Sequence, residues 1–484
     1  MLDTELDGVT VHMTGIKGSG MVALAQILHE RGARIRGTDT AERFYTDEIL
    51  EGLGIEVIEA FDAANILPET QLLVYSSAYN PDTHPELTAA RERSIPRYTY
   101  TEALGRLSER CDATAIAGVH GKSTSTALAG VLARAIGIPA TVVVGSMVPD
   151  FGNRAASVEG DRHFIAETCE YRRNFLSFHP DRIMVTGIEA DHLDYFRDYN
   201  DIFAAFVEYA ERLSTGGTLI YCCDDEGARE LASRIAVTRP DIHRVAYGFH
   251  ASGRYAVTGC ETVEGSLRFT LSGFDRVFSL RVPGHHNAVN AAGVLAVIEH
   301  ILRIDGERSL TGSVLESVVT ALSSFRGLKR RSEVVGTVDD ILVLDDYAHH
   351  PSAIEAELTA LREFYPGRRL VVDFMSHTYS RTAALLEDFA EALSGVDALF
   401  LHRIYASARE SYDGSITGRS LEEAVRRRGT VERVVYVEDP LQARELVIDE
   451  LKPGDIFLTM GAGDNWQLGR AVLTALTEGG ARVV

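Results

Sequence analysis

A short apolar run that leads into a glycine-rich turn and then a helix constrains the fold of this chain most. Residues 113–117 predict a buried strand, Gly118-Val-His120-Gly121-Lys122-Ser123-Thr124 follows, and a helical pattern runs from about 124 to 135. Glycines let the backbone approach phosphate oxygens, and N–H groups at a helix N-terminus attract them. Position 116 is Ile, so the full Walker spacing is not met. The strand–turn–helix order nevertheless favours a phosphate-binding loop over an ordinary glycine turn.

The same alternation of strands and helices recurs in three successive sections. The chain has 484 residues, enough for two to four domains. Strands are predicted at 9–13, 33–37 and 72–75, then at 113–117, 163–166, 182–186 and 218–222, and finally at 341–344, 370–374, 398–402 and 456–460. This pattern predicts an α/β fold with parallel sheets. Shorter alternating runs at 244–282 predict inserted antiparallel strands, and a helix is expected at 287–302.

Charge and composition exclude several classes of function. Lys and Arg total 48 and Asp and Glu total 70, so the net charge is 48 − 70 = −22. Bulk nucleic-acid binding needs a basic surface and is therefore not expected. The N-terminus has no signal-peptide pattern, and no run approaches the roughly 20 apolar residues of a membrane span. Five scattered cysteines without CxxC spacing predict free, buried thiols, and we expect a cytoplasmic protein without a membrane partner.

Acidic residues follow two of the strands predicted near the phosphate loop. Glu167 and Glu170 come after the strand at 163–166, and Glu189, Asp191, His192 and Asp194 come after the strand ending at 186. Ligands of open α/β sheets bind at the carboxyl ends of the strands. Carboxylates with one imidazole suit Mg²⁺ or Mn²⁺ better than a structural zinc, although any one of these residues alone suits a solvated loop equally well.

Four further segments leave their roles open. Gly15-x-x-Gly18-Ser19-Gly20 with Asp39 suits either a diphosphate cradle or a tight turn. Asn287 and Asn290 share one helix face, but their spacing alone favours a helix cap. Lys329-Arg330-Arg331 suits either a solvated patch or charge beside a triphosphate. The histidines at 349, 350 and 377 suit a polar substrate pocket or a zinc hydrolase, although no HExxH spacing is present.

Taken in order, these segments resemble the Mur ligase family over nearly the whole chain. The runs that carry the resemblance are HMTGIKGSGM, AGVHGKST, AETCEY, IEADHLDYF, VPGHHNAVNA, GLKRRSE, DDYAHHP and SHTYSRT. The resemblance implies three domains: a Rossmann-like UDP-sugar-binding domain at 1–108, a central P-loop-type ATP-binding domain with a parallel sheet at 109–326, and a C-terminal Rossmann-like ligase domain at 327–484.

The resemblance also implies a role for each matching residue. ATP would contact Gly118, His120, Gly121, Lys122, Ser123, Thr124, Asn287, Asn290 and Asp346, and the metal would contact Ser123, Glu167 and His192. Catalytic roles would fall to Lys122, Glu167, His192, Arg330 and Arg331. The UDP-sugar would contact Gly15, Gly18, Ser19, Gly20, Asp39, Ser76 and Ser77. The amino acid and the sugar acid would contact Tyr347, His349, His377 and Arg381. Thr378 stands where many members carry Arg.

The implied reaction joins L-alanine to UDP-N-acetylmuramate with ATP and Mg²⁺ or Mn²⁺, in the synthesis of peptidoglycan precursors. A recycling ligase that attaches a whole tripeptide to the same sugar acid is the nearest alternative. A regulatory nucleotide-binding ATPase is an alternative from another class. The resemblance leads us to expect a monomer or a weak homodimer.

Overall fold

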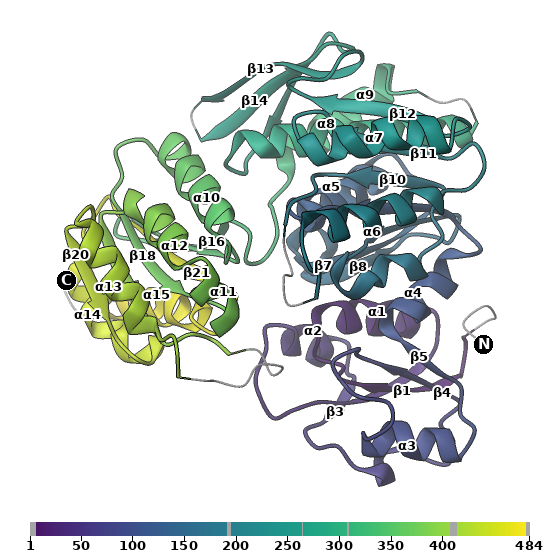
Figure 1. Ribbon diagram of the computed structural model, residues 1–484, viewed down its shortest axis with the longest axis horizontal. Helices are drawn as coiled ribbons and strands as arrows, with labels where there is room; N and C mark the ends of the chain where they lie inside the picture. The colour runs from purple at the N-terminus through teal and green to yellow at the C-terminus, as the bar shows by residue number, and fades with distance from the viewer. Residues whose placement is uncertain (1–5, 191–194, 264, 307–308, 407–413, 481–484) are drawn as a thin grey trace. The chain divides into compact units, whose positions relative to one another are not determined.

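The computed structural model describes residues 6–190, 195–263, 265–306, 309–406 and 414–480, which form three β-sheets covered by helices (Figure 1). The chain divides into two compact units. One consists of Met1–Cys260, Arg268–Leu280 and His286–Arg326, and the other of Glu261–Leu267, Arg281–His285 and Gly327–Val484. The predicted α/β class with parallel sheets is confirmed.

The first sheet has five strands in the order β3-β2-β1-β4-β5, and all its neighbours are parallel. The neighbouring strands β1 and β4 are mostly buried, as expected inside a parallel sheet covered by helices, whereas β2, β3 and β5 are partly exposed. Helix α1 buries a continuous stretch from Met21 to Leu28. The elements are β1 Thr10–Thr14, α1 Ser19–Glu30, β2 Arg34–Thr38, α2 Asp47–Gly52, β3 Glu56–Ile58, β4 Leu72–Tyr75, α3 Pro85–Glu92, β5 Arg97–Thr99 and α4 Tyr100–Ser108.

The second sheet places the strand of the phosphate loop between two other parallel strands. Its order is β15-β14-β13-β12-β11-β10-β6-β9-β7-β8, and β6 pairs with β10 and β9. The loops after these three strands therefore leave the same edge of the sheet. The elements are β6 Asp112–Ala117, α5 Lys122–Ala135, β7 Ala140–Val148, β8 Arg154–Val158, β9 His163–Glu167, β10 Arg182–Val185, α6 Tyr199–Glu211, β11 Thr218–Cys222, α7 Glu226–Thr238, β12 His243–Gly248, β13 Tyr255–Val263, β14 Ser266–Leu271, β15 Val277–Leu280, α8 His285–Ile304 and α9 Gly312–Ser324.

The prediction of inserted antiparallel strands at 244–282 is wrong for the first two of them. Strand β12 pairs in parallel with β11, and β13 pairs in parallel with β12, so both extend the central sheet. The alternating pattern has another cause, visible in β14, where buried and more exposed residues alternate. Alternation reports that one face of a strand is more open to solvent, and it does not fix the direction of the strand.

Helix α8 is the one helix of the described chain that is long and apolar enough to cross a membrane by length and composition. However, 78% of its apolar window is buried inside the structure. A helix that is apolar on all sides and buried in a domain is a core helix.

All five cysteines are free, as predicted. Their burial was predicted less well: Cys222 is buried, whereas Cys169 is exposed and the other three are half-buried. Cys169 lies on the segment after β9 rather than inside a strand or helix, which explains its exposure.

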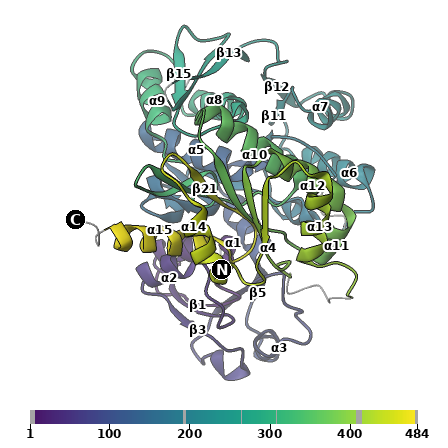
Figure 2. The ribbon, with the colours of Figure 1, turned by 90° about the vertical axis from the view of Figure 1, so that its left-hand side faces the viewer.

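The second unit holds a six-stranded sheet in the order β16-β17-β21-β18-β19-β20. Alternate residues of its strands face two cores: Leu342 and Leu344 pack with α10, α12 and α13, and Ile341 and Val343 pack with α14 and α15 (Figure 2). Among the described strands of this sheet, β16 is antiparallel to β17 and the other neighbouring strands pair in parallel. The elements are β16 Glu333–Val338, β17 Ile341–Asp346, α10 Pro351–Phe364, β18 Leu370–Met375, α11 Tyr379–Ala384, α12 Leu386–Ala392, β19 Ala398–Leu401, α13 Gly418–Arg428, β20 Arg433–Tyr436, α14 Arg444–Glu450, β21 Ile456–Gly461 and α15 Trp466–Gly480.

Candidate active site

The turn after β6 contains two glycines at positions where a side chain has no room. Gly118 has φ +129°, and a Cβ there would lie 2.2 Å from Thr186 Oγ1. Gly121 has φ +78°, and its Cβ would lie 2.8 Å from Asn290 Oδ1. Helix α5 begins at Lys122, two residues earlier than predicted. Lys122, Ser123 and Thr124 therefore occupy the first turn of the helix, where free N–H groups favour an anion.

Lys122 is held against the backbone of this turn. Its Nζ donates to the carbonyl oxygens of Gly118 and Val119 and lies 3.3 Å from Glu170 Oε2. Burial alone would lower the pKa of Lys122. The negative charge of Glu170 and of neighbouring acidic groups raises the pKa by more than that, so the pKa lies above its usual value. The side chain thus stays a cation at neutral pH. The Lys122–Glu170 pair is almost completely enclosed, with side chains 13% and 1% exposed.

Oxygen ligands suitable for a divalent cation lie beside the same turn. Glu167 ends β9 and accepts a hydrogen bond from the Gly145 amide at 2.9 Å through Oε2. Ser123 is buried on the first turn of α5. His192, the third predicted metal ligand, lies outside the described residues, as do Asp191 and Asp194. Among the described residues no group of three His, Cys, Asp or Glu side chains is arranged to hold a metal. Mg²⁺ commonly takes one or two carboxylates together with phosphate oxygens and water, and Glu167 with Ser123 fits that donor set.

The start of α8 places the Asn290 amide against the glycine-rich turn and the Asn287 amide next to Asn290. Asn290 donates through Nδ2 to Asn287 Oδ1 at 3.3 Å, and both side chains are buried. Asn290 also lies directly beside Gly121. This contact gives Asn290 a role that helix capping, the interpretation favoured by spacing alone, does not explain. His120 is exposed, with Nε2 3.7 Å from Glu189 Oε2.

The predicted UDP-sugar residues gather at the carboxyl ends of β1, β2 and β4. The turn after β1 is tied to β2, because Asp39 Oδ2 accepts from the Lys17 amide at 2.7 Å. The ammonium of Lys17, a residue not singled out in the sequence, is buried and lies 3.2 Å from Asp47 Oδ1. At Gly20 a Cβ would lie 2.7 Å from the Tyr100 ring. The set at this edge is Gly15, Gly18, Ser19, Gly20, Asp39, Ser76 and Ser77.

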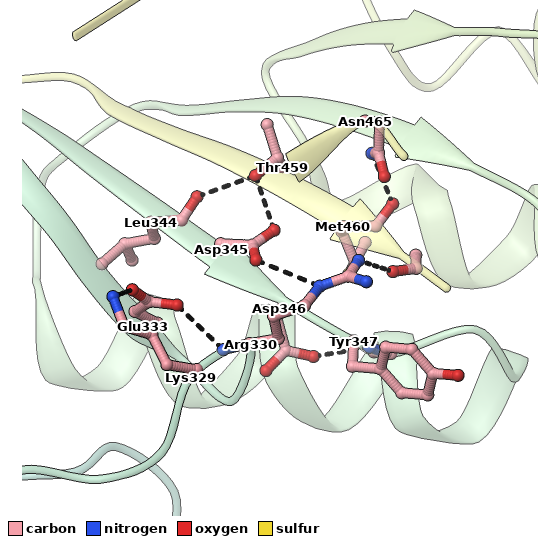
Figure 3. Close-up of polar contacts among 12 residues, drawn as sticks. Lys329, Arg330, Glu333, Leu344, Asp345, Asp346, Tyr347, Thr459, Met460 and Asn465 are labelled. Atoms are coloured by element: carbon pink, nitrogen blue, oxygen red, sulfur yellow. Dashed lines mark hydrogen bonds and ion pairs between the residues drawn. The ribbon is translucent and has the colours of Figure 1, made fainter. Parts of the chain in front are cut away.

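In the second unit, Arg330 points into the domain (Figure 3). Its Nε lies 3.2 Å from Asp345 Oδ2, and its Nη2 donates to the carbonyl oxygen of Gly461. Asp345 also accepts from Thr459 Oγ1 at 2.7 Å. Burial raises the pKa of Asp345 to about 6, although Arg330 acts to lower it. Arg330 therefore connects the ends of β17 and β21, and its own charge is already paired.

Arg331 lies in the opposite situation. It is exposed, although both guanidinium carbons lie near the Tyr347 ring, 5.4 Å from its centre for Arg331 and 5.1 Å for Arg330. Asp346 is buried and accepts from the Ser332 and Ala348 amides, both at 2.7 Å. The Asp346 carboxylate thus fixes the backbone around Arg331 and Tyr347. Of the two predicted arginines, Arg331 has the accessible guanidinium.

Aromatic rings line the loops after β17, β18 and β19. The centres of the Tyr347 and His349 rings are 5.0 Å apart, those of His349 and His377 are 5.8 Å apart, and those of His377 and Tyr405 are 6.1 Å apart. Thr378 caps the short helix α11, since its Oγ1 accepts from the Arg381 amide at 3.4 Å. Of the four residues predicted for the amino acid and sugar acid, Tyr347, His349 and His377 thus lie on two loops that follow strands paired with β21, and Arg381 lies on α11 directly after the second loop.

A buried polar network near these loops was not predicted from the sequence. His402, just after β19, lies between Asp373 Oδ2, which it contacts through Nε2, and the Val437 carbonyl, 2.8 Å from Nδ1. Asn465 Nδ2 donates to the other oxygen of Asp373 at 2.8 Å. Burial lowers the pKa of His402, but Asp373 raises it more, so that the net pKa is raised. Asp373 lies inside the predicted strand at 370–374, and its partners are distant in the sequence. Only the fold therefore reveals that Asp373 contacts His402 and Asn465.

Comparison with known proteins assigns the chain to a family. Residues 10–111 match the Mur ligase family catalytic domain, 116–298 the Mur ligase middle domain, and 330–463 the Mur ligase glutamate ligase domain. A protein of Treponema pallidum named UDP-N-acetylmuramate–L-alanine ligase is 45% identical over 478 residues, which are 99% of this chain and 98% of that protein. The chain belongs to the Mur ligase family. The resemblance noted in the sequence is thereby confirmed.

Solved structures of Mur ligases share the fold of this one. The UDP-N-acetylmuramate–alanine ligase MurC of Thermotoga maritima has a TM-score of 0.80 at 22% identity, covering 97% of this chain and 99% of that one. A murein peptide ligase of Psychrobacter arcticus has a TM-score of 0.68 at 19% identity, covering 99% and 100%. At these identities the likeness shows the three-domain α/β fold of the Mur ligases.

Proposed function

We propose that this Mur ligase joins L-alanine to the carboxylate of UDP-N-acetylmuramate, with conversion of ATP to ADP and phosphate, in the synthesis of peptidoglycan precursors. The observation that carries the proposal is the 45% identity, over 99% of the chain, to a relative named for this reaction. The five free cysteines fit a reducing compartment, and we place the reaction in the cytoplasm.

ATP is needed because a carboxylate does not condense with an amine unaided in water. A carboxylate oxygen of the sugar acid attacks the γ-phosphorus, and the bond to ADP breaks, which leaves an acyl phosphate. The amine of L-alanine then attacks the carbonyl carbon, loses a proton, and inorganic phosphate leaves. The protein contributes positioning and charge neutralisation. We assign to Lys122 the neutralisation of charge that moves onto the β-phosphate.

The metal and nucleotide contacts follow from the first unit. Mg²⁺ (or Mn²⁺) would be held by Ser123 and Glu167, with His192 as the third predicted ligand, and when bound it would neutralise charge on the phosphate groups. The backbone of the phosphate loop from Gly118 to Thr124, with His120, is assigned to the phosphates, and Asn287 and Asn290 to the nucleotide.

We assign the contacts with the other substrates to separate domains and residues. We assign residues 1–108 to UDP-sugar binding, 109–326 to ATP binding and 327–484 to the ligase domain. Arg331 is assigned to the γ-phosphate in preference to Arg330, because the Arg330 guanidinium is already paired with Asp345. Asp346 is assigned to adenosine, and Tyr347, His349, His377 and Arg381 to the amino acid and sugar acid.

The test is phosphate release with Mg-ATP, UDP-N-acetylmuramate and a panel of L-alanine, L-serine, glycine and the tripeptide of the recycling reaction. We expect turnover only when the sugar acid and a small L-amino acid are both present. Turnover with the tripeptide but not with L-alanine would establish the recycling ligase instead. Steady ATP hydrolysis at the same rate with and without the sugar acid would establish the regulatory ATPase.

A further inference from the structure

A cavity of about 290 Å³ lies on the first unit, away from the phosphate loop. It is bounded by β12, β13, the segment between them and the C-terminal part of α8. Its polar walls are Arg244, Ser252, Arg254, Tyr255, His300 and Arg303. His300 comes ten residues after Asn290 on α8, which corresponds to about 15 Å along the helix axis. The cavity is therefore distinct from the nucleotide site.

A buried carboxylate orients two of the three arginines. Glu299 is 2% exposed. Its Oε2 accepts from Arg254 Nε at 2.8 Å and from the Tyr255 hydroxyl, and its Oε1 accepts from Arg303 Nη2 at 3.2 Å. The Arg254 guanidinium also stacks over the Phe274 ring, 4.2 Å from its centre. Both cationic groups are thus held in place before any ligand arrives, which lowers the entropic cost of binding.

The cavity carries a surplus of positive charge. Arg244, Arg254 and Arg303 contribute three cations, and Glu299 offsets one of them. Burial and the neighbouring Arg303 lower the pKa of His300 to about 4, so this imidazole is neutral at physiological pH. Within the described part of the chain, the Arg244 side chain makes no ion pair or hydrogen bond with the protein. Such a concentration of positive charge is unusual in a chain of net charge −22, and it favours the binding of an anion.

We propose that this cavity is a second anion site, which binds inorganic phosphate or a small phosphate ester. Guanidinium groups recognise phosphate through paired N–H donors. Arg244, Arg254 and Arg303 approach from β12, from the segment just before β13 and from α8, and donors from three directions suit a tetrahedral anion better than a planar carboxylate. At roughly 30 Å³ per water molecule, the volume corresponds to about ten waters, which suits a small ligand.

The test is calorimetric titration of the full chain with inorganic phosphate and, in a second arm, with citrate. Variants Arg244→Ala and Ser252→Asp remove a cation from the cavity and add a carboxylate to it. Arg234→Ala is the matched control, because Arg234 is an exposed arginine on α7. Phosphate bound at the phosphate loop is common to all four proteins, so it cancels in the comparison.

We expect both cavity variants to weaken this phosphate-binding event on the order of tenfold or more, since each disturbs charge-assisted contacts. Arg234→Ala should stay within about twofold, as expected for a distant surface charge. Equal phosphate affinity in all four proteins, or an equal loss in the control, would overturn the proposal. So would binding of citrate without binding of phosphate. Because Arg244 and Ser252 are exposed, both variants should keep the melting temperature of the parent without phosphate, and phosphate should raise that temperature less in the variants.

Discussion

Lys122 has two predicted roles: its charge acts on the phosphates of ATP, and it pairs with the buried Glu170. Replacing Lys122 with Met tests both roles. Methionine keeps most of the length and the apolar stem but removes the cation. If Lys122 stabilises the charge that moves onto ADP, its loss costs about 3 kcal/mol, on the order of a hundredfold in turnover. A second effect follows from the structure. Lys122 lies 3.3 Å from Glu170, whose side chain is 1% exposed, so the substitution leaves a carboxylate buried without its cation.

The stability cost of that orphaned carboxylate is predictable in size. Breaking a buried ion pair by removing one partner typically costs about 3–5 kcal/mol. We therefore expect Lys122→Met alone to melt at a clearly lower temperature. Glu170→Gln removes the buried charge, so the double variant Lys122→Met/Glu170→Gln should recover much of the lost stability. It should not recover turnover, because the cation that meets the phosphate is still absent.

The assay is a double-mutant cycle read in two ways. Thermal unfolding gives the coupling between the two side chains, and phosphate release gives activity. Calorimetry with UDP-N-acetylmuramate should show nearly unchanged affinity in the stable double variant, since we assign that ligand to the separate turn at residues 15–20. Near-normal turnover in the double variant would refute the phosphate role of Lys122. Additive losses of stability would refute the buried pair.

Three further predictions concern other parts of the chain. Arg330→Ala should lower the melting temperature, since it leaves Asp345 buried without its cation at a cost of about 3–5 kcal/mol. Arg331→Ala should lower the melting temperature less, because the exposed Arg331 acts on the buried Asp346 through its charge but forms no ion pair within the described residues, and should slow phosphate release; the reverse pattern would exchange the two roles. Hydrogen bonds from His12, Asn65, Thr14 and Thr38 outweigh burial and lower the pKa of Glu86 to about 2 from 4.5. Its stabilisation should be complete above pH 4.5 and fade as pH falls toward 2, so melting curves of the parent and of Glu86→Gln should converge in acid; a constant gap across that window would contradict this. Glu167→Gln should raise the Mg²⁺ concentration needed for half-maximal turnover, and an unchanged requirement would remove Glu167 from the metal site.

Local sequence was enough to predict the parts that depend on neighbouring residues. The strand before Gly118, the two glycines and the following helix lie within about 20 residues, and their order alone predicted a phosphate loop. The strands at 72–75 and 218–222 were predicted with the bounds that the structure has. The prediction failed at 244–282, because alternating burial reports exposure and not strand direction.

The sequence by itself therefore determined the α/β class and the family, and it predicted the phosphate loop and the acidic strand ends beside it. Only the tertiary structure decided how charges are shared. It paired Lys122 with Glu170, buried Arg330 against Asp345 while leaving Arg331 exposed, and placed Asp373 beside His402 and Asn465. It also brought Arg244 and Arg303 to one cavity. The physical reason is that these partners lie 15 to 92 residues apart in the chain. Sheet order and helix packing decide which of these residues come into contact, and neither can be predicted from the spacing of neighbouring residues.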